Sequence, residues 1–219
     1  KIGMEESTSK EKVLKRIRKA LLNKSTEAIA NVDFESNIYA SNNETLEINF
    51  AQNFTEAGGK FVFCLDYNEC IDNLLYLAKE NNWNKIFCLE EPLQELLDIG
   101  ELSHSSSEND YNQLQACITT CEFLIAQTGS IVVSSRQTSG RKTPFAFPLH
   151  LVVAFTSQLV NETKEAMKNM KLKYPTQFPS FVSIITGPSK SNAMDISMTI
   201  GALGPKEIYV FLIDDLIAE

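Results

Sequence analysis

The chain has 219 residues, of which 43% are hydrophobic and 22% are charged, and its formal net charge is −8. A globular chain of this size buries roughly 70% of its unfolded surface, so it needs neither a disulfide nor a metal to fold. The negative charge disfavours bulk nucleic-acid binding, and no stretch reaches the ~18 uncharged apolar residues of a membrane span.

The first predicted element is a basic amphipathic helix over residues 10–22 (KEKVLKRIRKALL). Val13, Leu14, Ile17 and Leu21 recur at helical spacing, with six basic residues around them. Such a helix can lie on a membrane surface or pack on a partner. Its few apolar positions favour packing on its own domain or on a sister subunit. Residues 24–43 are polar, and we expect them to be irregular.

The segment that follows alternates helices and strands. In chain order we expect a helix over 44–57, a strand over 60–65, a helix over 68–81, a strand over 85–89 and a helix whose first turn holds Pro92. This alternation predicts an α/β fold in which helices connect the strands of a parallel sheet.

The second half begins after a polar loop over 103–110. Residues 116–126 are mostly apolar and are expected to form a strand and then a helix. Asn161 is a plausible N-cap for a helix over 162–172. Further strands are expected over 130–134, 149–155, 181–185 and 207–214, and a further helix over roughly 194–200.

The five cysteines indicate a reducing compartment. Cys64 and Cys88 lie inside apolar runs, which is typical of buried free thiols. Cys117 and Cys121 are four residues apart and would share a face if that segment were helical, but no further Cys or His follows at metal-ligand spacing, so core packing is expected and a metal is not. Because residues 1–12 also lack the apolar core of a signal peptide, we expect a cytoplasmic protein.

Positive charge is concentrated in one part of the chain. Between residues 123 and 194 the net charge is +6, against −14 in the rest. The four lysines of 164–173 are interpreted as the solvated face of a helix. Arg136 and Arg141, with Lys142, are different, because a guanidinium is a planar fork suited to carboxylate or phosphate. Their loop is either an anion clamp or a solvated hairpin.

Glycine-bearing loops precede or follow several of the predicted strands. The loop 127–130 and the loop 186–190 allow the backbone to approach a ligand, and the second lies where a strand leads into a predicted helix. The loop 201–206 is either a helix C-cap and turn or a further ligand contact. The spacing of glycine and lysine in 186–190 excludes a P-loop.

Neither histidine identifies a catalytic arrangement. His104 lies in a polar loop. His150 begins a buried strand, where it is either a satisfied core histidine or a group that orients a ligand or acts as a base. No Ser-His-Asp or Cys-His arrangement follows from the spacing, so the catalytic residues are unknown.

Four motifs in order resemble the LUD-domain family. They are Ala126-Gln127-Thr128-Gly129-Ser130-Ile131-Val132, Pro148-Leu149-His150, Ile185-Thr186-Gly187-Pro188-Ser189-Lys190 and Gly201-Ala202-Leu203-Gly204-Pro205-Lys206-Glu207-Ile208. The opening helix is also similar. The resemblance implies a fold like that of the NagB/RpiA/CoA-transferase group, with a parallel-rich sheet and helices on both faces. It implies a basic helix and linker over 1–43 and a LUD-like domain over 44–219.

The resemblance also implies a role in oxidising L-lactate to pyruvate beside iron–sulfur oxidoreductase subunits, with the cluster on those partners and no cofactor on this chain. Gln127 and Leu203 stand where the family has Glu and His, and two extra residues fall between Lys190 and Asp195. The loss of two acid/base groups favours anion binding over proton transfer. The residues expected to bind the small anionic metabolite are Thr128, Gly129, Ser130, Arg136, Arg141, His150, Gly187, Ser189, Lys190 and Gly204.

Two alternatives to this accessory role stay open. One is an enzyme like the CoA transferases or sugar-phosphate isomerases, and the other is a non-catalytic structural subunit that assembles through its basic helix. A homo-oligomer is compatible with each reading.

Overall fold

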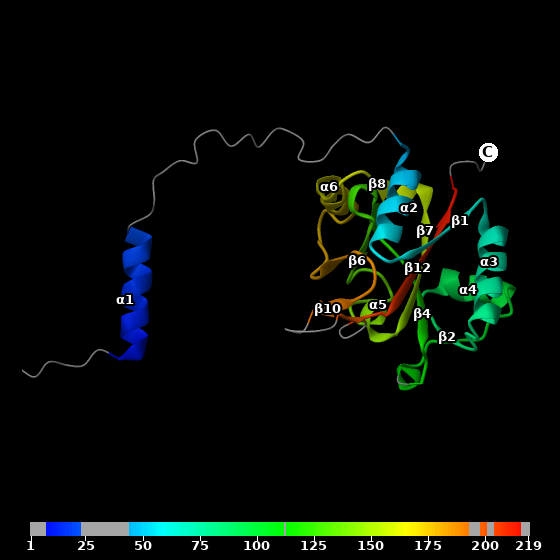
Figure 1. Ribbon diagram of the computed structural model, residues 1–219, viewed down its shortest axis with the longest axis horizontal. Coiled ribbons are helices and arrows are strands. Elements are labelled where there is room, and N and C mark those ends of the chain that lie inside the picture. The colour runs from blue at the N-terminus through cyan, green and yellow to red at the C-terminus, as the bar shows by residue number, and fades with distance from the viewer. Residues whose placement is uncertain (1–7, 23–43, 112, 193–197, 201–203, 216–219) are drawn as a thin grey trace, which may run out of the picture. The chain divides into compact units, whose positions relative to one another are not determined.

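The computed structural model describes residues 8–22, 44–111, 113–192, 198–200 and 204–215. The chain divides into two units, residues 1–41 and residues 42–219. The first unit contains the helix α1 (Ser9–Leu22), and the second contains every other described element (Figure 1). None of the described helices is long and apolar enough to cross a membrane.

The helix predicted over 10–22 is confirmed as α1, and its start is defined locally. Thr8 and Glu11 form a capping box: the Glu11 backbone N–H donates to Thr8 Oγ1 at 3.4 Å, and the Thr8 N–H donates to Glu11 Oε2 at 3.0 Å. Lys19 lies in the last turn, where a cation complements the helix dipole. The irregular segment predicted over 24–43 lies outside the described residues.

A six-stranded sheet, parallel throughout, is the centre of the second unit. Its order is β1–β12–β7–β4–β2–β3. The parallel-rich α/β fold predicted from the sequence is therefore confirmed. The bounds of the strands are Lys60–Cys64 (β1), Ile86–Phe87 (β2), His104–Ser105 (β3), Ala116–Thr120 (β4), Leu149–Phe155 (β7) and Glu207–Ile213 (β12).

Two helices cover one face of this sheet. The helices α3 (Tyr67–Glu80) and α4 (Glu91–Ile99) bury Leu74 and Leu97 against side chains such as Ile118 and Phe211. Asp66 caps α3 by accepting the backbone N–H of Glu69 at 2.8 Å. Pro92 lies in the first turn of α4, as predicted.

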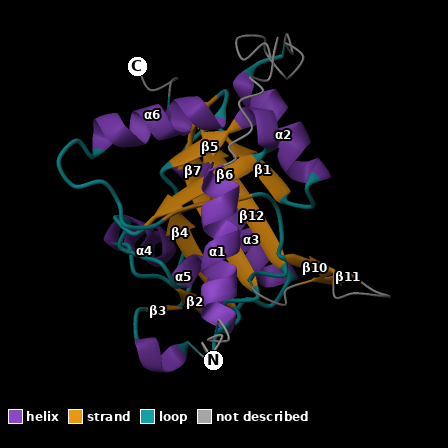
Figure 2. Cartoon of the chain, turned by 90° about the vertical axis from the view of Figure 1, so that its left-hand side faces the viewer, coloured by secondary structure: helices purple, strands orange, loops and turns teal. Residues whose placement is uncertain are grey.

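The opposite face is covered by the helix α2 (Leu46–Glu56) and by a second sheet of four strands (Figure 2). The order of this sheet is β8–β5–β6–β9, with bounds Leu159–Val160, Phe123–Ile125, Ser130–Ser134 and Val182–Ile185. Its outer face packs on α6 (Thr163–Lys173) through Ala166. Helices therefore lie on both faces of the parallel sheet, as the sequence predicts.

Three local predictions are wrong. Residues 116–126 form β4, β5 and the start of the 3-10 turn η2 (Ala126–Thr128) rather than a strand and a helix, because each strand finds a partner in a different sheet. Cys117 and Cys121 therefore share no helix face. The N-cap of α6 is Glu162, and Asn161 instead donates its backbone N–H to Glu165 Oε2 at 2.9 Å.

The prediction of a helix over roughly 194–200 is also wrong for its last three residues. Residues Met198–Ile200 form β11, which pairs antiparallel with β10 (Lys190–Asn192). Thr199 and Ile200 are β-branched, which favours the strand. Residues 193–197 lie outside the described part of the chain. The remaining short elements are α5 (Thr143–Ala146), η1 (Glu108–Asp110) and η3 (Thr156–Gln158).

Gly129 lets the turn after η2 lie directly against α2. Its φ is +57°, and a Cβ at this position would lie 2.2 Å from the backbone nitrogen of Phe54. Asn53 fixes the same contact by donating its side-chain amide to the carbonyl of Ala126 at 2.8 Å. Only glycine combines this backbone conformation with so close an approach.

We therefore expect Gly129→Ala to destabilise the fold far more than Gly140→Ala. Gly140 also has a positive φ, +64°, but a Cβ there would meet nothing nearer than 4.0 Å. Gly140→Ala should lower the free energy of unfolding by about 1–2 kcal/mol, the cost of the left-handed conformation. Gly129→Ala should cost about 2 kcal/mol more, because a packed backbone must move. Urea unfolding of both variants measures the difference, and equal losses would exclude the close approach.

Candidate functional site

The parallel sheet reverses its winding direction between β2 and β4. From β2 the chain continues through α4 to β3 on one side, whereas from β4 the next strand of this sheet is β7 on the other side. In open α/β sheets, ligands bind beyond the carboxyl ends of the strands at such a switch point. Glu90 follows β2 and Thr120 ends β4, so both lie at this position.

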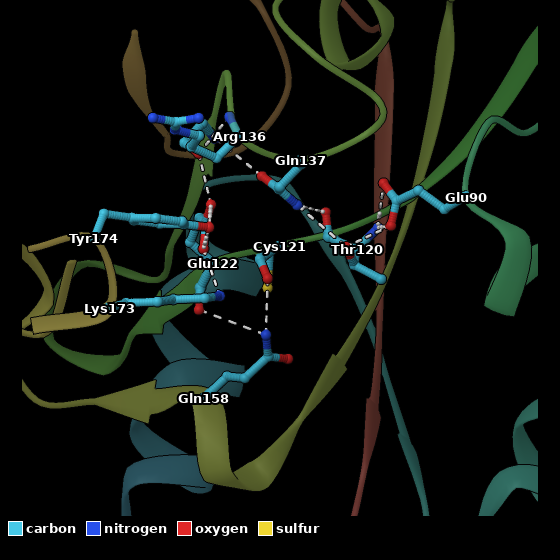
Figure 3. Close-up of polar contacts among 10 residues, drawn as sticks. Glu90, Thr120, Cys121, Glu122, Arg136, Gln137, Gln158, Lys173 and Tyr174 are labelled. Carbon is cyan, nitrogen blue, oxygen red and sulfur yellow. Dashed lines mark hydrogen bonds and ion pairs between the residues drawn. The ribbon is translucent and has the colours of Figure 1, made fainter. Parts of the chain in front are cut away.

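Glu90 and Thr120 are joined directly at the switch point. Thr120 donates its hydroxyl to Glu90 Oε2 at 2.5 Å and its backbone N–H to the same oxygen at 3.1 Å. Glu90 is only 7% exposed. Gln137 reaches this pair from the loop that follows β6, donating its amide to the Thr120 carbonyl at 2.8 Å and accepting the Ser134 N–H at 2.9 Å. The side chain of Gln137 therefore fastens the loop to the end of β4 (Figure 3).

A second carboxylate, Glu122, is buried two residues after Thr120, with 1% of its surface exposed. It accepts hydrogen bonds from Ser134 Oγ at 2.6 Å and from the Tyr174 hydroxyl at 3.0 Å, and it pairs with Lys173 Nζ at 2.7 Å (Figure 3). Burial alone would lower the pKa of Lys173, but the hydrogen bond and charge of Glu122 outweigh it and raise that pKa. Burial and the same carboxylate raise the pKa of Tyr174. The cluster is therefore a charge-neutral anchor for the end of α6.

Beside this anchor lies an open hollow of about 710 Å³, which we call the arginine hollow. Arg136 donates Nε and Nη2 to the carbonyl of Gln177 at 3.2 and 2.8 Å, and Arg141 donates Nη2 to the hydroxyl of Ser180. No lining residue is acidic. The residues that line the hollow are Ser135, Arg136, Arg141, Thr176, Gln177, Phe178 and Ser180.

Glu122 and its partners hold the two walls of the arginine hollow. One wall is the loop that follows Ser134, the last residue of β6, and Ser134 Oγ also accepts the backbone N–H of Arg136 at 3.0 Å. The other wall is the segment after α6, which begins at Tyr174. Because Ser134 and Tyr174 bind the same carboxylate, the starts of the two walls are fixed relative to each other.

The sequence-predicted site residues do not form one hollow. Arg136 and Arg141 lie beyond the carboxyl end of β6, whereas Gly129 lies before its start. A strand of five residues spans about 17 Å. Because β9 runs antiparallel to β6, Gly187 joins Gly129 at the far end.

That far end is occupied by internal contacts with α2 and its C-terminal turn. A Cβ on Gly187 would lie 2.3 Å from the carbonyl oxygen of Ala57, to which Lys190 donates its ammonium at 3.0 Å. Ser130 Oγ lies 2.7 Å from Thr128 Oγ1 and 2.7 Å from Thr186 Oγ1. Gly204 lies against Ser189, whose Cβ would be 3.2 Å from a Cβ on the glycine. The turns at Gly129, Gly187 and Gly204 are therefore packed against other residues of the chain.

His150 lies within β7 and is fully buried. Its Nε2 is 2.8 Å from Thr119 Oγ1, and the Thr119 hydroxyl donates its single proton to the Thr120 carbonyl. His150 Nε2 must therefore be the donor, which leaves Nδ1 as an acceptor that finds no hydrogen-bond partner among the described residues. Burial lowers the pKa of His150 to about 3, so the imidazole is neutral at physiological pH.

Sequence reasoning missed Glu90, Thr120 and Glu122. The available signal was their position, because each lies at the end of a parallel strand or two to three residues beyond it. Among the residues that the structure describes, no group of three His, Cys, Asp or Glu side chains could hold a metal ion. The five cysteines are all free and buried.

Known proteins share parts of this chain. The model of the LUD domain matches residues 48–213. An uncharacterized protein of Neisseria meningitidis is 27% identical over 103 residues, which cover 47% of this chain and 44% of that protein. Lactate utilization protein C of Bacillus pumilus is 29% identical over 96 residues, which cover 43% of this chain and 40% of the relative. The chain thus spans less than half the length of either relative in these matches.

The fold also has a counterpart among solved structures. The crystal structure of a DUF162 family protein from Deinococcus radiodurans matches with a TM-score of 0.59 at 15% sequence identity. The match covers 77% of this chain and 96% of that one. At this identity the likeness establishes a shared fold.

Burial of neutral His150 predicts a pH dependence of stability. The unfolded chain binds a proton at this histidine below pH 6.5, whereas the folded protein does so only near pH 3. Stability is therefore lost as the pH falls between these values, by at most about 1.4 kcal/mol per pH unit. His150→Gln retains a donor for Thr119 but does not titrate. We expect its free energy of unfolding, measured in urea between pH 5 and 6.5, to fall less steeply than that of the wild type. Parallel slopes would contradict the buried neutral state.

Proposed function

Because this chain belongs to the LUD-domain family, we propose that it is an accessory protein of L-lactate utilisation that binds a small anion in the arginine hollow. Relatives named lactate utilization protein C support the pathway. In this proposal the oxidation of L-lactate to pyruvate takes place with iron–sulfur partner subunits, and the chain itself carries no cluster. Its five buried free thiols favour a reducing, cytoplasmic setting.

The observation that carries the proposal is the pair of guanidinium groups in one open hollow whose lining residues include no acid. Arg136 is held by Nε and Nη2, so its Nη1 has no hydrogen-bond partner among the described residues. Arg141 uses only Nη2 in the same way. The neutral acceptors that orient these forks do not neutralise their charge. An arriving carboxylate or phosphate therefore meets two oriented cations.

The position of the hollow supports the same function. Gln137 ties its loop to Thr120 at the switch point, and Glu122 ties both walls to the end of β4. The guanidinium groups are thus presented from a backbone that is already ordered. Preorganisation of this kind lowers the entropy lost when a ligand binds. The other residues predicted to bind the ligand lie elsewhere in the fold, so contacts from them would require a second subsite. They are Thr128, Gly129, Ser130, His150, Gly187, Ser189, Lys190 and Gly204.

Titration calorimetry tests the arginine hollow with L-lactate, pyruvate and inorganic phosphate as separate probes at low salt. We expect at least one of them to bind, and Arg141→Ala to weaken that binding at least tenfold, because one of two cations is lost. Arg141→Lys should recover only part of the affinity, since an ammonium lacks the planar fork.

Lys168→Ala is the matched control, because it removes one exposed positive charge from α6 without touching the hollow. The control should bind as the wild type does. If no probe binds, or if Arg141→Ala and Lys168→Ala weaken binding equally, the hollow is not an anion site.

One observation favours a second candidate function, an enzyme like the CoA transferases or sugar-phosphate isomerases. These chemistries need a carboxylate, and Glu90 supplies one at the switch point, where Thr120 orients it. The purified protein would be assayed with acetyl-CoA plus an acceptor acid and with ribose 5-phosphate. We expect no turnover. Turnover that Glu90→Gln abolishes at unchanged melting temperature would replace the accessory role by an enzymatic one.

A further inference from the structure

The helix α1 has an apolar stripe whose side chains are about half exposed. The side chains of Val13, Leu14 and Ile17 are 55%, 51% and 50% exposed. At 100° per residue these three residues and Ala20 fall within an arc of about 120°. A stripe this exposed contributes little to stability in water, so α1 has an apolar face available for another surface.

The rest of the circumference of α1 is basic. Glu11 is the only acidic residue within Ser9–Leu22, and its carboxylate is engaged in the capping box with Thr8. The cations on the side of the helix away from the stripe are Lys12, Lys15, Arg16, Arg18 and Lys19.

A helix of this length also needs a surface to be stable. Isolated helices shorter than about 12–15 residues are marginal in water even with good sequences, and α1 has 14 residues. Its cap and the basic residue in its last turn support the helix but do not bury the stripe. Binding through the stripe would therefore raise the helix content of this segment.

The positive charge of α1 favours one kind of binding surface over the others. A second copy of α1 would bring a second set of cations alongside the first, which like-charge repulsion opposes. Protein interfaces depend on large anchors such as Trp and Tyr, and the stripe has only aliphatic side chains. An anionic lipid surface requires no such anchor, attracts every cation at once and accepts a shallow stripe of aliphatic groups.

We propose that α1 binds an anionic lipid surface and lies in its plane, with the stripe at the boundary of the acyl chains. A helix of 14 residues is about 21 Å long, shorter than the ~30 Å hydrocarbon core, so it lies on the bilayer and does not span it. The lysine and arginine stems extend their charged ends to the headgroups. Because the stripe is small, attachment is reversible and depends on the lipid charge.

Flotation of the full-length chain with lipid vesicles tests this proposal. We expect binding to vesicles of phosphatidylcholine with 30% phosphatidylglycerol to be at least tenfold tighter than to phosphatidylcholine alone, and to fall at least tenfold in 0.5 M salt. Leu14→Gln with Ile17→Gln, which removes the stripe, and Lys15→Gln with Arg18→Gln, which removes charge, should each weaken binding at least tenfold.

Lys164→Gln with Lys168→Gln is the matched control, because it removes two exposed cations from α6 and leaves α1 intact. This variant should bind as the wild type does, and all variants should melt at the wild-type temperature. Equal binding to neutral and anionic vesicles, no binding, or the same loss in the α6 control would overturn the proposal. A fall in solution mass of the stripe variant without vesicles would overturn it in favour of self-association.

Discussion

The candidate site depends on one interaction, the burial of the Glu122 carboxylate among Lys173, Tyr174 and Ser134. An unpaired buried charge costs several kcal/mol, so this carboxylate is stable only while all its partners stay in place. Those partners end α6 and β6, which are far apart in sequence. The requirement to neutralise one carboxylate therefore fixes the origin of both walls of the arginine hollow, and the loop and the segment that form it cannot separate without exposing that charge.

The two buried carboxylates, Glu122 and Glu90, differ in the groups that bind them. Glu122 has a cation within 2.7 Å and acts as an anchor. Among the residues that the structure describes, Glu90 pairs with no cation, and its carboxylate accepts the hydroxyl and N–H of Thr120. Glu90 lies where parallel sheets receive ligands. Gln137 joins the two, since it contacts Thr120 with one end of its amide and Ser134 with the other.

The sequence predicts strands and helices well where a single residue pattern determines them. Runs such as Leu149–Phe155 and Glu207–Ile213 are short, almost wholly apolar and rich in β-branched or aromatic residues, which is typical of buried parallel strands. The second sheet was harder to predict. β5 has three residues and β8 has two, and such short strands have no periodicity of their own. They are strands because β6 and the parallel sheet provide partners, which is information about the whole fold.

The candidate site follows the same rule: what a local residue pattern determines was predictable, and what the whole fold determines was not. Arg136 and Arg141 were predictable because arginines without acids nearby in sequence indicate an anion site. Their separation from Gly129 and Gly187 was not, because the arginines and Gly129 lie at opposite ends of β6, and the antiparallel pairing of β6 with β9 places Gly187 at the same end as Gly129. A glycine in a loop allows either a ligand or another part of the backbone to lie close to it. Here the backbone of α2 and its C-terminal turn lies against Gly129 and Gly187.

The distribution of charge makes both basic regions compatible with an acidic protein. At physiological salt the Debye length is about 8 Å, so a guanidinium in the arginine hollow responds to charges within that radius and not to the net charge of −8. Glu122, the carboxylate that anchors the walls of the hollow, is already paired with Lys173. The acidic remainder of the chain repels anions from most of the surface, and local attraction survives only where cations lack acidic neighbours. The acidity of the whole chain and the cationic lining of one hollow are therefore consequences of the same uneven charge.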